Sequence, residues 1–182
     1  VFVERIAQLT HLGESATTTL RNAVDARPRV FSARTNLFVP DSFPDGIHLI
    51  TAGIGARTKK TQQGREQIVS FLLPGDFIGV QAYPGVHLDH YVRALSQLES
   101  LHLTRDVVED LVERVPEIVD AFWTAMLLEH AITCEWVVNV GVRMALERIA
   151  HLFCEIFTRL ESMRLVVGSR CMLPLRQIHD FP

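Results

Sequence analysis

The segment Gly64–Gly79, GREQIVSFLLPGDFIG, constrains the fold more than any other part of this chain. Its first half contains Gln67–Leu73, a run rich in Val, Ile, Phe and Leu that favours a β-strand. Pro74-Gly75-Asp76 then predicts a turn, and extended chain resumes at Phe77-Ile78-Gly79. A Gly-Asp turn between two apolar strands leaves backbone N–H groups free to face a small anionic ligand. We therefore treat Gly75–Gly79 as part of a candidate effector pocket, and a plain tight turn is the alternative.

The stretch from Arg29 to Leu103 alternates short apolar runs with turn residues. Pro-Asp, Asp-Gly and Pro-Gly pairs separate its β-rich runs at close intervals. The runs are Val30-Phe31, Asn36–Val39, Ile47–Ile50, Gln67–Leu73, Phe77–Val80 and Tyr91–Leu103. Many short strands with regular turn signals predict a closed or double-sheet antiparallel barrel.

Helices are expected on both sides of this β-rich region. Val3–Gln8 and Glu14–Val24 have the pattern of short helices before it. After it, Arg105–Arg114 predicts a short helix and Pro116–Val140 a long one, with Pro in the first turn and Gly141 just past the end. About 25 residues at ~1.5 Å each give a rod of roughly 37 Å.

The long helix is apolar on several sides, so it needs more than one packing partner. We expect one side to cover the barrel and another to pair with a second copy of the chain, as in a coiled coil. The stripe assigned to this dimer interface comprises Ile118, Phe122, Ala125, Ile132 and Trp136. A further amphipathic helix is predicted over Met144–Leu160, because its apolar residues follow the i, i+3, i+4, i+7 pattern.

Composition excludes several classes of protein. Hydrophobic residues make up 48% and charged residues 21% of the 182 positions, as in globular proteins. The net charge of −3 gives no basic footprint, so a DNA-binding surface must be local or lie outside this chain. Three widely spaced cysteines predict neither a disulfide framework nor an iron–sulfur cluster, and they indicate a cytoplasmic protein. Charged and polar residues interrupt the most apolar segment, Ala121–Val142, which argues against a membrane span.

Three segments, in this order, resemble the cyclic-AMP receptor protein / fumarate-nitrate regulator family of bacterial transcription factors. They are DGIHLITAGI at Asp45–Ile54, GREQIVSFLLPGDFIG at Gly64–Gly79 and VRMALERIAHLFCEIFTRL at Val142–Leu160. The resemblance covers roughly residues 15 to 177. It implies an α+β fold in which an antiparallel β-roll, double-sheeted and cyclic-nucleotide-binding-like, is followed by a long dimerisation helix and the start of a winged helix-turn-helix domain.

The implied organisation has three parts. Residues 1–114 form the β-roll sensor domain with its N-terminal helices, 115–141 the dimerisation helix, and 142–182 an incomplete helix-turn-helix domain without its recognition helix. The resemblance implies a homodimeric transcriptional regulator in which an effector repositions the long helix. DNA and RNA polymerase are the partners expected of the full-length protein, and this chain alone should bind DNA poorly.

The resemblance leaves the effector open. Cyclic-nucleotide-binding members use a Gly-Glu turn for the ribose, and Gly75-Asp76 stands at that place. Their phosphate-binding Arg and Ser/Thr correspond to Leu88 and Asp89, of which Leu cannot pair with phosphate and Asp repels it. The usual cyclic-AMP mode is therefore disfavoured, and the expected ligand is an unidentified small molecule. Thr133 and Cys134 correspond to base-contacting positions, with ordinary packing of the cysteine as the alternative.

Two rival functions remain open. One is a stand-alone ligand-binding or dimerisation module that never binds DNA, and the other is a cupin-like metal enzyme. His87 and His90 invite the second, but residues i and i+3 of a strand point to opposite faces and should not converge. We therefore expect no metal ligands. We also expect no catalytic residues, because Ser-His-Asp, P-loop and Rossmann patterns do not stand out. The remaining scattered histidines, expected to be structural or solvated, include His48, His102, His130 and His151.

Overall fold

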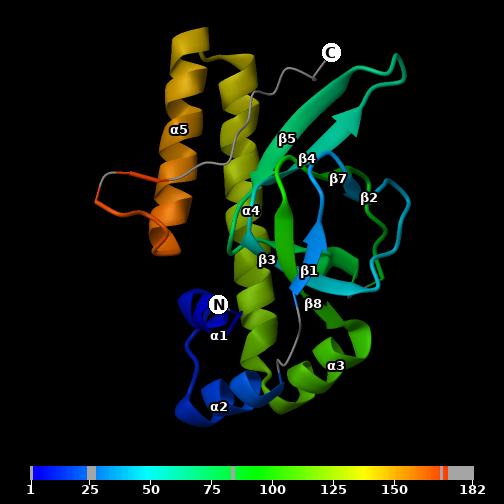
Figure 1. The fold of residues 1–182 in the computed structure, drawn as a ribbon, viewed down its shortest axis with the longest axis vertical. Coiled ribbons are helices and arrows are strands. Elements are labelled where there is room, and N and C mark those ends of the chain that lie inside the picture. Colours follow the sequence, from blue (N-terminus) through cyan, green and yellow to red (C-terminus); the bar gives the residue numbers. More distant parts are fainter. Residues whose placement is uncertain (1, 24–27, 83–84, 169, 172–182) are drawn as a thin grey trace.

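The computed structural model describes residues 2–23, 28–82, 85–168 and 170–171 (Figure 1). Two short helices, α1 (Phe2–Leu9) and α2 (Glu14–Ala23), come first. The strands, with one short 3-10 helix, are β1 (Pro28–Phe31), β2 (Asn36–Phe38), β3 (Gly46–Ala52), β4 (Gly55–Lys60), β5 (Glu66–Leu72), β6 (Phe77–Ile78), η1 (Val80–Ala82), β7 (Tyr91–Ala94) and β8 (Leu98–Thr104). They are followed by α3 (Arg105–Arg114), α4 (Glu117–Gly141) and α5 (Ala145–Ser162). The expected α+β order of elements is confirmed.

The described strands form two antiparallel four-stranded sheets. One sheet has the order β1-β8-β3-β6 and the other the order β2-β7-β4-β5. The turn between β5 and β6 carries the chain from one sheet to the other, so the Gly64–Gly79 segment joins the two layers. The core shared by both sheets consists of Ile50, Leu72, Ile78, Val92, Ala94 and Leu98. This is the expected β-roll.

A second apolar core lies between the first sheet and the helices. Ile47 and Leu49 of β3 contribute to it, together with Leu20 of α2, Leu111 of α3 and Ile118 of α4. Because side chains alternate along a strand, the other residues of β3 point into the roll. The first sheet is therefore packed on both faces, and α1, α2, α3 and the start of α4 are fixed against it.

The long helix α4 runs past the β-roll as a single element of 25 residues (Figure 1). Its bounds differ by one residue from the expected Pro116–Val140. Among the described helices, none combines the length and the apolar character that crossing a membrane requires.

The side of α4 that faces the β-roll is the side expected to face a partner chain. Ile118 and Phe122 are 0% and 5% exposed, in the core that α4 shares with α1 and β6. The ring of Phe122 meets that of Phe77 edge-on, with 5.4 Å between centroids. Ala125 and Ile132 on the same side are half-buried. The predicted dimer interface of α4, which we call the predicted seam, is therefore wrong at Ile118 and Phe122, because packing within the chain already covers both side chains.

The opposite side of α4 carries a stripe of exposed apolar residues. Its members are Val119, Trp123, Leu127 and Val137, with exposed fractions between 45% and 69%. Their successive spacings of four, four and ten residues place them on one face of a helix. We call these four residues the outward stripe.

Helix α5 turns back and lies beside the upper half of α4 (Figure 1). Ile156 and Leu160 pack against Phe71 of β5. Trp136 of α4 donates its indole N–H to Glu155 Oε2 at 2.7 Å and packs on the ring of Phe71. Trp136, the last member of the predicted seam, is therefore also engaged within the chain. Apolar residues on the other side of α5 stay exposed, among them Leu146, Ile149 and Phe153.

Candidate effector site

A cavity of about 490 Å³ lies between the β-roll, α4 and α5, with α1 along one side. The residues that line it include the aromatic Phe77 and five charged residues: Arg5, Arg57, Asp76, Glu129 and Arg159. Guanidinium groups from α1, β4 and α5 thus meet carboxylates from the β5–β6 turn and α4. A concave wall with a few convergent charged groups is suited to a small polar ligand, and guanidinium groups favour an anionic one.

Arg57 of β4 is a buried charge in the cavity wall, only 6% exposed. Its Nη1 lies 2.5 Å from Glu129 Oε1 on α4, and its Nη2 donates to Phe77 O at 2.9 Å. Among the described residues, Arg57 Nε has no hydrogen-bond partner. Burial raises the pKa of Glu129, although the Arg57 charge acts in the opposite direction. The pair joins the β-roll to α4 inside the space that a ligand would occupy.

A second buried pair joins the β-roll to α5. Asp76, in the β5–β6 turn, accepts a hydrogen bond from Leu73 N at 2.7 Å and one from Arg159 Nη2. Arg159 also donates to Glu155 Oε1 at 2.7 Å and to Phe71 O at 3.1 Å. Burial alone would lower the pKa of Arg159, but the Asp76 and Glu155 carboxylates together hold it above its usual value.

Helix α1 bridges the turn of the roll and the end of α5. Arg5 Nε donates to Gly75 O at 2.8 Å, and Gln8 Nε2 donates to Ser162 O at 3.1 Å. Burial lowers the pKa of Arg5, and the nearby Asp76 charge opposes that effect. Three helices and the roll therefore enclose the cavity through polar contacts as well as apolar packing.

Comparison with known proteins identifies the β-roll and the helix that follows it. Residues 28–115 match the family model of the cyclic nucleotide-binding domain. The nitrogen fixation regulation protein FixK of Azorhizobium caulinodans is 25% identical over 132 residues, which make up 72% of this chain and 52% of FixK. The transcriptional activator protein FnrL of Cereibacter sphaeroides is 29% identical over 121 residues, or 66% of this chain and 48% of FnrL. The chain therefore contains a cyclic nucleotide-binding-like domain and is similar to regulators of the Crp/Fnr family. It spans about half the length of these curated relatives.

Solved structures of the Crp/Fnr family share the fold. FixK2 from Bradyrhizobium japonicum has a TM-score of 0.70 at 21% identity, covering 83% of this chain and 73% of FixK2. CLP from Xanthomonas campestris, a c-di-GMP responsive global regulator, has a TM-score of 0.63 at 18% identity, covering 80% of this chain and 74% of CLP. The β-roll with a long helix after it is therefore the Crp/Fnr arrangement.

The Gly-Asp turn reaches the cavity only in part. Asp76 and Phe77 are lining residues. Gly75 and Gly79 have positive φ angles of 97° and 86°, so they shape the turn around the two lining residues. Ile78 is 1% exposed and belongs to the core between the sheets. Two of the five predicted positions therefore face the candidate ligand space.

The predicted phosphate-binding positions lie elsewhere. Leu88 is 1% exposed, and Asp89 pairs with Lys59 Nζ at 2.6 Å and with His90 Nδ1 at 2.9 Å. These two hydrogen bonds, that from Lys59 first, lower the pKa of Asp89 to about 2. Neither Leu88 nor Asp89 is among the lining residues of the cavity. This chain has Leu88 and Asp89 where the cyclic-nucleotide-binding members have Arg and Ser/Thr. Because neither residue lines the cavity, the difference does not change the charge of the cavity wall.

The predicted base-contacting pair of α4 is also outside the cavity lining. Thr133 and Cys134 are exposed. Thr133 Oγ1 donates to Glu129 O at 2.9 Å, and Cys134 Sγ lies 3.6 Å from His130 Nε2. Within α4, the polar contribution to the cavity comes from Glu129 instead.

The sequence interpretation missed the charged residues that dominate the cavity wall. Arg57 stands in a β-strand and Arg159 on an amphipathic helix, where a single arginine carries no motif. Glu129 was visible as a lone carboxylate in an otherwise apolar part of α4, and this was the one available signal. Arg57 pairs with Glu129, and Arg159 with Asp76, across more than 70 positions of the chain, which local spacing does not reveal.

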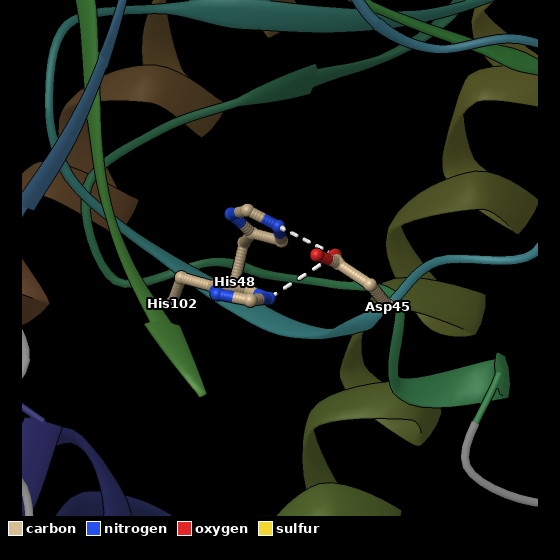
Figure 2. A group of neighbouring side chains, drawn as sticks. All are labelled: Asp45, His48 and His102. Atoms are coloured by element: carbon tan, nitrogen blue, oxygen red, sulfur yellow. Dashed lines mark ion pairs between the residues drawn. The ribbon is translucent and has the colours of Figure 1, made fainter. Parts of the chain in front are cut away.

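A separate cluster was also missed. Asp45, His48 and His102 bring their ligand-type atoms within 4.8 Å of one another (Figure 2). His102 Nε2 lies 3.1 Å and His48 Nε2 3.9 Å from Asp45 Oδ1. Burial, with the nearby His102 and Arg29 charges, lowers the pKa of His48 to about 4, although Asp45 opposes the shift. The two histidines come from β3 and β8, and only the strand pairing shows that they meet.

Proposed function

We propose that this chain is the sensor and dimerisation part of a homodimeric transcriptional regulator controlled by a small effector in the cytoplasm. The observation that carries the proposal is the cavity shared by the β-roll, α4 and α5. A ligand in this space contacts three elements at once. It can therefore favour one arrangement of α4 and α5 over another, which is how binding free energy shifts a conformational equilibrium.

The effector expected from the cavity wall is a small anion. Arg57 has one guanidinium nitrogen without a hydrogen-bond partner in the described part of the chain, and its salt bridge to Glu129 is exchangeable with a ligand. An anion that pairs with Arg57 would displace Glu129, whose side chain is 41% exposed and free to turn toward solvent. Ligand binding would thereby separate α4 from β4 at this contact.

The outward stripe of α4 supports the homodimer. Contiguous exposed apolar residues on a helix are typical of an interface, and a two-fold pair of α4 helices would bury the stripe of each protomer against the other. Crp/Fnr proteins act as DNA-binding dimers, so the proposal follows the general assembly of the family. Dimerisation through α4 would couple the two cavities, because the same helix lines the cavity and carries the stripe.

Calorimetric titration of the purified chain with cyclic AMP, cyclic GMP and cyclic di-GMP tests the effector site. We expect at least one of these anionic nucleotides to bind, and Arg57→Met to weaken that binding by more than about tenfold through loss of a charge-assisted hydrogen bond. Arg114→Met, at an exposed arginine of α3, is the matched control and should bind as the unmodified chain does. Unchanged affinity in Arg57→Met would contradict the proposed site.

A gel-shift measurement on the natural gene product at full length tests the regulator. The expected result is DNA binding that depends on the effector. A full-length product that binds the effector and dimerises without binding any DNA would favour the rival function, a stand-alone ligand-binding module.

A further inference from the structure

We propose that Asp45, His48 and His102 form a binding site for one divalent transition-metal ion, with zinc as the expected occupant. The site is independent of the effector proposal, since none of the three residues lines the cavity. It lies where β3 begins, at the end of the roll interior between the two sheets (Figure 2).

Strand pairing places the two histidines side by side. His48 of β3 and His102 of β8 are directly opposite partners in the antiparallel register, so their side chains project from the same face of the sheet. Their rings lie 4.5 Å apart between centroids. Asp45 immediately precedes β3 and directs its carboxylate to both rings (Figure 2). Two elements distant in sequence thus supply three metal-type ligands.

Both imidazoles have a buried nitrogen available to a metal. The His48 and His102 side chains are 2% and 6% exposed, and both Nε2 atoms have no hydrogen-bond partner within the described residues. His102 Nε2 nevertheless lies within ion-pair distance of Asp45 Oδ1, at 3.1 Å. Leaving a nitrogen such as His48 Nε2 unpaired in a protein interior costs about 1–3 kcal/mol, and a bound cation would remove that cost.

The second nitrogen of His48 is already occupied. Its Nδ1 lies 2.9 Å from Ser100 Oγ, another buried residue of β8. A hydrogen bond at one ring nitrogen fixes the ring and the tautomer and leaves the other nitrogen to the metal, as in most histidine metal sites. Phe31 and Phe38 pack their rings edge-on against His48. These ring contacts limit the rotation of the His48 imidazole.

The spacing fits a small ion after a modest adjustment. Ligand atoms bound at about 2.0–2.1 Å in a tetrahedron are roughly 3.3 Å apart. The pair His102 Nε2–Asp45 Oδ1 is already close to this, at 3.1 Å, while His48 Nε2 is 3.9 Å away. Asp45 is 61% exposed and can rotate to close that gap. Two imidazoles and one carboxylate favour zinc or a neighbouring transition metal over magnesium or calcium, and leave a fourth position for water.

Arg29 of β1 competes for the same carboxylate. Its Nη2 lies 3.5 Å from Asp45 Oδ2, and the side chain is 47% exposed. A bound divalent cation would displace or repel the guanidinium group. Removing the arginine charge should therefore strengthen metal binding, which is a signature that a merely structural histidine cluster would not give.

The test uses the full chain in a Cys134→Ser background, because Cys134 and His130 are an exposed pair of side chains of the types that ligate zinc. After treatment with a chelator, zinc is titrated calorimetrically and cobalt is used as an optical substitute. We expect one equivalent to bind, with visible cobalt absorption and no thiolate-to-metal band. Zinc should also raise the melting temperature of the chain, since it binds only the folded state.

Asp45→Asn and His102→Gln should each weaken zinc binding by at least about 10- to 100-fold. Asp45 is exposed, so its variant should keep the native circular dichroism spectrum, and His87→Gln serves as a control outside the cluster. Arg29→Gln should bind zinc more tightly. Failure of the folded background chain to bind one equivalent would overturn the site. So would an Asp45→Asn affinity equal to the background, or an Arg29→Gln affinity no tighter.

Discussion

Arg159 of α5 pairs with Asp76 of the β-roll, 83 positions earlier in the chain. The side chains are 17% and 20% exposed, so the pair is largely shielded from solvent. Asp76 lies in the β5–β6 turn, within the Gly64–Gly79 segment on which the family resemblance rests. The pair is thus a charged contact between that turn and α5. The position of α5 beside the cavity therefore depends on a residue of that turn.

Asp76→Asn should destabilise the chain by about 2–3 kcal/mol, because it leaves a buried guanidinium with one partner fewer. The effect should appear in urea unfolding, and hydrogen exchange should be faster in α5 than in the β-roll. Asp110→Asn breaks an exposed i,i+4 pair with Arg114 and is the control, costing no more than about 0.5 kcal/mol. Equal losses of unfolding free energy in the two variants would show that the Asp76–Arg159 pair does not hold α5 to the roll.

The Arg57–Glu129 pair should respond unequally to the loss of either member. Glu129→Gln leaves Arg57, which is 7% exposed at its side chain, without its counter-charge, and should cost about 3 kcal/mol. Arg57→Met should cost less, because Glu129 can turn to solvent. The double variant Arg57→Met/Glu129→Leu should recover most of the loss, since a buried ion pair seldom exceeds the stability of apolar packing. A double-mutant cycle by chemical unfolding measures all three, and strictly additive losses would show that the two residues do not interact.

Charges placed on the outward stripe should produce monomers. Trp123→Glu and Val137→Glu are expected to weaken self-association by about 2 kcal/mol or more, or roughly 30-fold, as for the loss of an interface hot spot. Val30→Glu, at an equally exposed position of β1, is the control. Sedimentation velocity measures the assembly state. Phe122→Glu should instead unfold the chain, because that residue is 5% exposed within the core. A folded, monomeric Phe122→Glu variant would instead support the predicted seam, in which Phe122 contacts the partner chain.

His90 should make the chain less stable in mild acid. Burial lowers its pKa below the ordinary value, while its hydrogen bond with Asp89 opposes the shift. The unfolded state therefore binds a proton more readily than the folded state, so stability falls as the pH drops below about 6.5, at about 1.4 kcal/mol for each unit of pKa shift. His90→Gln should lose less stability than the unmodified chain between pH 7 and pH 5. Parallel melting curves across that range would contradict the assignment.

Gly79 should tolerate no side chain. Its φ is +86°, and an added Cβ would lie 2.6 Å from Gly46 O. Gly79→Ala should therefore cost more than about 2 kcal/mol, combining backbone strain with a clash against main chain. Gly64→Ala separates the two causes, since φ is +80° there but nothing lies within 4 Å of the added atom. That control should cost about 1 kcal/mol in thermal unfolding. Equal costs would show that the clash is relieved by movement.

Periodicity and turn chemistry predicted the elements well and their partners less well. The expected strand Gln67–Leu73 appears as β5, Glu66–Leu72, and the long helix differs by one residue at each end. The run Tyr91–Leu103 is two strands, because Leu95 N and Ser96 N both donate to Ile54 O and turn the chain there. Ile54 lies in the connection between β3 and β4, and hydrogen bonds to such a distant segment leave no local trace in the sequence.

The dimer interface of α4 shows which part of the structure periodicity alone does not predict. Ile118 and Trp123 are both large apolar residues of one helix, and hydrophobic periodicity finds a stripe through either. Which stripe turns inward depends on the shape of the roll and on the return of α5, which only the three-dimensional packing determines. The same holds for the cavity, where Arg57 and Glu129 meet from elements far apart in the chain.

The chain has two tryptophans, and α4 carries both on opposite sides. Trp123 is 62% exposed on the outward stripe, whereas Trp136 donates to Glu155 of α5. Intrinsic fluorescence can therefore follow two separate events without any added dye. In a Trp136→Phe chain the emission reports the burial of one helix against another chain, and in a Trp123→Phe chain it reports the docking or release of α5. After an effector is added, the emission that changes first shows whether dimer assembly or the release of α5 occurs first.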